Sequence, residues 1–75
     1  MNTDRFTRLV RRKPFRPFVV RMADGQALQV THPESVVVVP DARLAAIATG
    51  DGGLELVDIP LVTSVRLEKG SARRR

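Results

Sequence analysis

The residues best suited to chemistry are basic, and they gather in the first sixteen positions of the chain. The segment has one acid, Asp4, and a net charge of +5. Its six cations are Arg5, Arg8, Arg11, Arg12, Lys13 and Arg16. Such a cluster binds phosphates with a salt-dependent, largely sequence-independent affinity. Because only Asp4 lies among them, pairing between helix neighbours cannot account for so many cations. The segment therefore predicts contact with the phosphates of a nucleic acid, either RNA or DNA.

The charge of the remaining chain supports a second interpretation of the same residues. Residues 17–69 carry a net charge of −3, and residues 70–75, which include three arginines, carry +3. An acidic body could hold a basic segment by internal charge pairing. The sequence does not decide between this pairing and contact with an external polyanion.

One histidine and two carboxylates form the other group with chemical potential. His32, Glu34 and Asp58 could in principle act as a base or bind a metal. His32 is followed by Pro33, however, and His-Pro-Glu is typical of a turn whose polar side chains bond the local backbone. Without cysteine there is no thiolate metal site, and the single histidine cannot make a zinc site by itself. We favour the turn, and we expect no enzyme activity, catalytic residue, metal, cofactor or small-molecule substrate.

A short amphipathic helix is expected to position the basic residues. Thr3 is suited to the N-cap and Asp4 to the first turn. Pro14 ends the helix, which is predicted over about residues 3–12 and is too short to be stable unless it docks. Its apolar face has the spacing i, i+3, i+4: Phe6, Leu9 and Val10. Residues 14–17, with two prolines, then form a stiff extended linker.

From Phe18 onward the apolar period changes to two, which predicts strands. Asp24-Gly25 predicts a tight hairpin, and the composition of residues 50–53 predicts another. Residues 50–53 are not a phosphate-binding loop, because they lack its lysine and following helix. Residues 35–39 form a β-branched run, predicted as a strand buried on both faces. Residues 43–49 have helical propensity, but their bounding turns favour a strand. Residues 54–58 and 62–67 are the last predicted strands, separated by a 3₁₀ turn at residues 59–61.

The predicted class is mainly β: a short N-terminal helix followed by a five- to six-stranded, strongly bent antiparallel sheet or a small SH3/Sm-like barrel. One domain is expected over residues 1–69, with residues 70–75 as a disordered basic tail. Without cysteine, packing or oligomerisation must supply the stability. No apolar run approaches a membrane span, and the first residues lack the apolar core of a secretory signal. We therefore expect a cytoplasmic protein without membrane contact.

The order of helix, five strands and a short turn before the last strand resembles the Sm-like barrel, including its bacterial Hfq-type members. That family grips RNA through two motifs at strand turns, the second with a Lys-His pair before the final strand. The matching stretch here is Val57-Asp58-Ile59-Pro60. Because Asp58 stands where the family has a base, the resemblance implies architecture and does not carry over the family's RNA site.

A second resemblance rests on residues 14–67. Its pattern is Pro14-Phe15-x-Pro17-Phe18, Ala23-Asp24-Gly25, His32-Pro33-Glu34, an Asp-Gly hairpin and a final Leu61-Val62. The pattern resembles a group of short uncharacterised bacterial proteins, and it implies no activity.

Two functions are therefore expected. The first is a binding module that contacts nucleic-acid phosphates through the basic helix and tail. Base stacking is a weak expectation, because Phe6 and Phe18 are predicted in the core and only Phe15 is expected to be exposed. The second is a structural or protein-interaction module, including a homo-oligomer, that uses strand edges or the Pro14–Pro17 linker.

Overall fold

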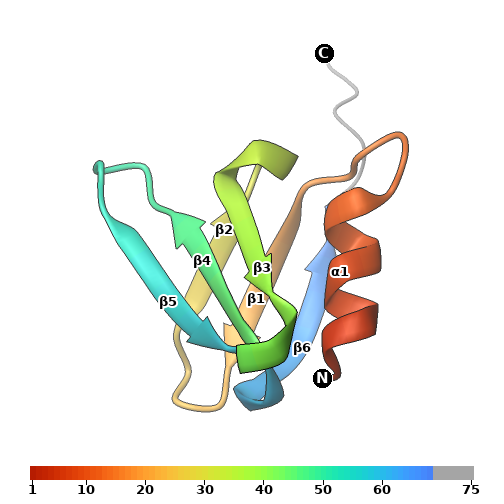
Figure 1. Ribbon diagram of the computed structural model, residues 1–75. Coiled ribbons are helices and arrows are strands. Elements are labelled where there is room, and N and C mark those ends of the chain that lie inside the picture. The colour runs from red at the N-terminus through yellow and green to blue at the C-terminus, as the bar shows by residue number, and fades with distance from the viewer. Residues whose placement is uncertain (69–75) are drawn as a thin grey trace.

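Residues 1–68 are described by the computed structural model, which contains one α-helix and six strands (Figure 1). Residue 69 and the predicted tail at 70–75 lie outside the described residues. The elements are α1 (Thr3–Arg11), β1 (Phe18–Met22), β2 (Ala27–Val30), β3 (Val36–Val39), β4 (Leu44–Ala48), β5 (Leu54–Asp58) and β6 (Val62–Leu67). Three 3₁₀ turns join them: η1 (Pro33–Ser35), η2 (Pro40–Ala42) and η3 (Ile59–Leu61).

The strands form two three-stranded antiparallel sheets, with the orders β2-β1-β6 and β3-β4-β5. The chain leaves the first sheet after β2, completes the second, and returns through η3 to place β6 beside β1. The predicted class, mainly β with five to six strands after a short helix, is confirmed. The ladders among residues 1–68 do not join the two sheets, so the predicted barrel is not confirmed.

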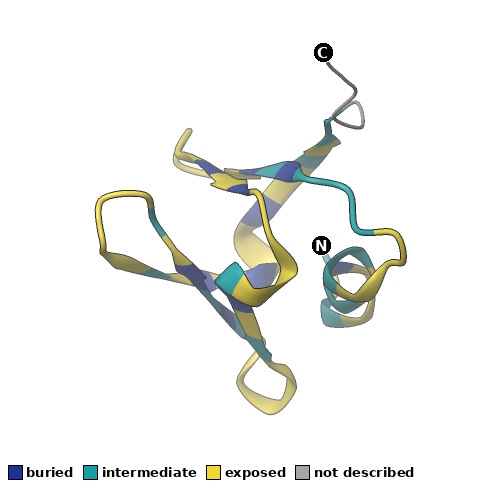
Figure 2. Cartoon of the chain, turned by 90° about the horizontal axis from the view of Figure 1, so that it is seen from above, coloured by how far each residue is buried: buried dark blue, intermediate teal, exposed yellow. Residues whose placement is uncertain are grey.

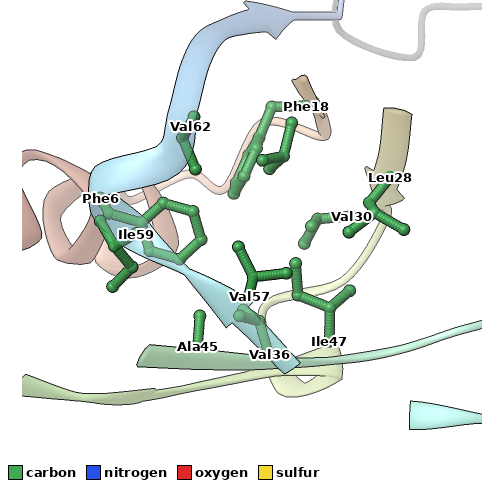
Figure 3. Close-up of a cluster of buried hydrophobic side chains, with 11 residues drawn as sticks. Phe6, Phe18, Leu28, Val30, Val36, Ala45, Ile47, Val57, Ile59 and Val62 are labelled. Atoms are coloured by element: carbon green, nitrogen blue, oxygen red, sulfur yellow. The ribbon is translucent and has the colours of Figure 1, made fainter. Parts of the chain in front are cut away.

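The core lies between the two sheets (Figure 3). Buried and exposed residues alternate along the strands, as Figure 2 shows, because successive side chains of a strand point to opposite faces. Among the described residues no polar or charged residue is buried. The core residues are Phe6, Phe18, Val20, Leu28, Val30, Val36, Ala45, Ile47, Val57, Ile59 and Val62.

The β3-β4-β5 sheet both confirms and corrects the sequence predictions. Residues 44–48 form a strand, as predicted, because pairing with β3 and β5 outweighs the helical propensity of alanine and leucine. The prediction that β3 is buried on both faces is wrong. Val36 is buried, but Val37 and Val39 are exposed. A continuous apolar run is typical of a strand covered on both sides, and no described element covers the second side of β3.

None of the helices in residues 1–68 is long and apolar enough to cross a bilayer. The helix α1 has nine residues, and the remaining helical segments are single 3₁₀ turns of three residues each.

The Asp24-Gly25 hairpin is confirmed, and it depends on glycine. Gly25 has a φ of 93°, a conformation that L side chains rarely adopt. The Asp24 carboxylate stabilises the turn by accepting a hydrogen bond of 2.9 Å from the Gln26 backbone N–H. The local sequence was sufficient for this prediction because all the stabilising groups lie within five residues.

We expect Gly25→Ala to lower the free energy of unfolding by about 1 kcal/mol, because alanine is strained at positive φ. Urea denaturation measures the change. The matched control is Gly50→Ala, at a loop position without positive φ and with open space around its Cα, which should be neutral or slightly stabilising. Equal losses in the two variants would contradict the assigned conformation of Gly25.

Candidate nucleic-acid interface

The helix α1 begins at Thr3 and is capped by the residue before it. Asn2 is extended, and its Oδ1 accepts a hydrogen bond of 2.8 Å from the Arg5 backbone N–H. The prediction that Thr3 is the N-cap is therefore wrong by one position, because both residue types are good caps and the sequence offered them side by side. Asp4 lies in the first turn, as predicted, where its charge favours the helix dipole.

The apolar face of α1 docks on the core through Phe6. This ring is fully buried and meets Phe18 edge to face, with centroids 6.1 Å apart and planes at 89°. Leu9 and Val10 are partly buried against the same cluster, which confirms the predicted face. An edge-to-face aromatic pair is a favoured geometry, so the contact fixes the rotation of the helix about its axis.

The rotation set by Phe6 turns the basic residues away from the core. At about 100° per residue, Arg8 and Arg11 fall on the side of α1 opposite Phe6, and Arg5 falls on the flank, about 100° from Phe6. Arg12 and Lys13 follow directly after the helix. All five are exposed, and they are called the basic face below: Arg5, Arg8, Arg11, Arg12 and Lys13.

Internal charge pairing of the basic face is not found within residues 1–68. The one ion pair of these residues joins Arg66 Nε and Glu68 Oε2 at 4.0 Å, and neither residue belongs to the basic face. No carboxylate of the described chain therefore lies within ion-pair distance of the basic face. Its cations are solvated and available to an external anion.

Arg16, the sixth predicted contact residue, has a structural role instead. It is half-buried, and its Nε and Nη2 donate hydrogen bonds of 3.1 and 2.8 Å to the Glu68 backbone carbonyl. The Glu68 N–H donates in turn to the Pro17 carbonyl at 2.8 Å. Arg16 therefore fastens the linker to the end of β6 and does not join the basic face.

Phe15, expected to be exposed, is half-buried and packs against Phe18 with centroids 5.9 Å apart. Phe6 and Phe18 are in the core, as predicted. Most of the aromatic surface of the described chain is therefore used internally, and a base has no free ring of Phe6 or Phe18 on which to stack.

The possible site at His32, Glu34 and Asp58 is not assembled. His32 is the N-cap residue of η1, and its carbonyl accepts a hydrogen bond of 3.0 Å from the Ser35 N–H, which confirms the predicted turn. The His32 side chain makes no capping hydrogen bond, so the expected bond from the side chain to the backbone is not found there. Asp58 pairs with Leu44 at the far end of the second sheet, about four strand residues or roughly 13 Å from the end where His32 lies. Residues 1–68 contain no cluster of three His, Cys, Asp or Glu side chains that could hold a metal.

The loop at residues 50–53 is a hairpin turn, as predicted. The Asp51 carboxylate accepts a hydrogen bond from the Thr49 hydroxyl and another, of 2.9 Å, from the Gly53 N–H. These bonds favour the charged form and lower the pKa of Asp51 from its ordinary value of 3.8. The carboxylate is committed to the turn and is not poised for proton transfer.

A groove of about 520 Å³ lies between α1 and β6. Arg5 is the one ionisable side chain in its lining. Arg5 therefore belongs both to the basic face and to the lining of this groove. The lining residues are Met1, Arg5, Leu9, Val62, Thr63, Ser64, Val65 and Leu67.

Comparison of the chain with family models, with curated proteins and with solved structures finds no match.

Sequence reasoning missed the outward apolar residues of the second sheet. In β5, Val57 is buried, so Leu54 and Leu56, which have the opposite parity, point outward. The signal was present, since a strand with apolar residues at both parities must expose one set unless a second layer covers it. No such layer was predicted for this strand.

The position of the N-cap can be tested with two neighbouring variants. We expect Asn2→Ala to lower the free energy of unfolding by about 1 kcal/mol, because one backbone N–H of the first turn loses its acceptor. Thr3→Ala should change it little, since Thr3 lies within the helix and alanine has the higher helix propensity. Urea titration compares the two, and a larger loss for Thr3→Ala would contradict the assignment.

Proposed function

We propose that this chain is a cytoplasmic, non-enzymatic binding module that contacts nucleic-acid phosphates through the basic face of α1. The observation that carries the proposal is that five exposed cations, without an ion-pair partner in residues 1–68, lie on α1 or directly after it, and that Phe6 fixes this helix to the core. A solvated cluster of one sign attracts counterions, and their release on binding drives association with a polyanion.

The geometry of the basic face suits a phosphate backbone. From Arg5 to Arg12 the helix rises about 10 Å, which is about three phosphate steps along one strand of a duplex. Exposed arginines on one helical stripe contact phosphates without reading bases. The internal packing of Phe15 favours backbone contact over base stacking, so the module should accept both RNA and DNA.

Binding should weaken steeply with salt. If about four phosphates are neutralised, affinity falls about 100-fold between 50 and 200 mM salt. The probes are a mixed-sequence single-stranded RNA of about 20 nucleotides and a DNA duplex of matching sequence, with binding measured by fluorescence anisotropy. Replacing Arg8 and Arg12 with Glu should abolish most of the affinity and reduce the salt slope by about two.

The matched control carries the same change of charge on the outer face of the first sheet. Arg21 and Arg66 are exposed there, and the Arg21→Glu, Arg66→Glu double variant should retain the salt slope of the wild type. Equal losses in the two double variants would show a net-charge effect and contradict a localised interface. Absence of binding to both probes at 50 mM salt would refute the proposal.

A second candidate function is a structural or protein-interaction module that forms a homo-oligomer and has no role with nucleic acid. The observation that favours it is that β3 and β5 are edge strands of an open sheet, whose unpaired backbone groups can accept another chain. The Pro14–Pro17 linker is less suitable, because Phe15 and Arg16 are engaged within the molecule. From the resemblance of the sequence, we also propose that the architecture is that of a small Sm-like barrel.

The oligomer is tested by light scattering. A mass at a multiple of the 8.3 kDa chain supports this second function, whereas a monomer at about 100 μM, well above micromolar dissociation constants, would reject it.

A further inference from the structure

The outer side of the β3-β4-β5 sheet is apolar across all three strands. In the register of the sheet, Val37 lies beside Ala46 and Ala46 beside Leu56, while Ala48 lies beside Leu54. Asp58 is the one ionisable side chain in these outward rows, and it lies at a corner, beside Leu44. We call this surface the outer apolar face: Val37, Val39, Leu44, Ala46, Ala48, Leu54 and Leu56.

The large side chains of this face are well exposed. Val37 is 61% exposed and Val39 46%, and Leu54 and Leu56 are each 67% exposed. Four of the five large hydrophobic residues exposed in the described chain therefore lie on one sheet face. With its alanines, the face presents apolar surface on the order of 500 Å², within the size range of the largest apolar patch of a soluble monomer, which is often functional.

The first sheet shows what a solvated face looks like in the same chain. Its outward positions pair Val19 with Gln29 and Arg66, and Arg21 with Ala27 and Ser64. Polar and charged residues thus cover the outer side of β2-β1-β6, as expected of an antiparallel sheet with one side in water. The contrast indicates that the outer apolar face is covered in the functional state.

The charge and the area of the outer apolar face indicate which partner covers it. The outer apolar face offers no charged group except the corner Asp58, so a charged partner gains nothing from it. A second copy presents the same flat, apolar face, and aligned sheets pack well at about 10 Å. Two copies would bury on the order of 1,000 Å² in total, the lower bound for a specific interface.

We propose that the chain forms a two-fold dimer in which the outer apolar faces of two copies pack together, with the axis close to Ala46. With the two-fold axis running along β4, the central strand of the sheet, β5 of each copy lies against β3 of the other. Leu56, which is level with Val37 in the register of the sheet, then faces Val37 of the other copy. The inference deepens the homo-oligomer function proposed above and rests on it, but it names a sheet face in place of strand edges.

The first test is a surface charge. The wild type should have the mass of two chains at about 100 μM, with a micromolar dissociation constant suited to a small interface. Leu56→Glu should raise this constant at least about 100-fold, because it places two like charges in the contact. The matched control is Gln29→Glu on the outer face of the first sheet, which should remain a dimer. Circular dichroism checks that both variants are folded.

The second test uses the absence of cysteine from the chain. Ala46→Cys should be cross-linked into a dimer by a bis-maleimide of about 10 Å span, the separation of packed sheets. Gln29→Cys should not be linked. This readout decides the question if Leu56→Glu fails to fold.

These tests distinguish homo-oligomerisation in general from dimerisation through the outer apolar face. A monomeric wild type overturns both the face and the homo-oligomer function. An assembly that survives Leu56→Glu, and that Ala46→Cys does not link, overturns the face and leaves an oligomer formed through strand edges. A mass of three or more chains overturns the two-fold arrangement.

Discussion

The contact of Phe6 with Phe18 is the interaction on which the basic surface of the molecule depends. A nine-residue helix is unstable alone in water, and burial of one phenylalanine side chain contributes roughly 2–3 kcal/mol. Phe6 is the one fully buried residue of α1 and its main anchor to the core, and Leu9 and Val10 are partly buried against the same cluster. The orientation of the arginines therefore follows from an aromatic contact and not from any contact that the arginines make.

The small number of helices explains why the outer face of the β2-β1-β6 sheet is polar, whereas that of the β3-β4-β5 sheet is apolar and uncovered. Residues 1–68 supply one α-helix, and that helix seals one side of the space between the sheets (Figure 2). No described helix is left to cover the second sheet. The apolar residues of β3 and β5 that point outward are then a consequence of topology, because a strand that serves a core on one side must expose its other parity.

The parts of the fold that local chemistry determines could be predicted from the sequence. The Asp24-Gly25 turn, the end of α1 before Pro14 and the strand at residues 44–48 follow from short-range rules. The burial of β3 could not be predicted, since four consecutive valines have the same composition whether one or two layers cover them. The role of Arg16 was also hidden, because its acceptor is a backbone carbonyl 52 positions away. The exposed basic face followed from helical periodicity, whereas its lack of internal partners required the fold.

The helix α1 and strand β5 lie on opposite sides of the core (Figure 1), and α1 contributes no residue to the outer apolar face. A molecule built from two chains through that face would carry two basic helices on one rigid body. When one helix is bound to a polyanion, the other meets the same strand at a high effective concentration, which can raise overall avidity 10²- to 10⁴-fold without a new contact. Weak binding of phosphates by each short helix would then be sufficient for stable attachment to a long nucleic acid. A nucleic acid too short to reach both helices would bind more weakly.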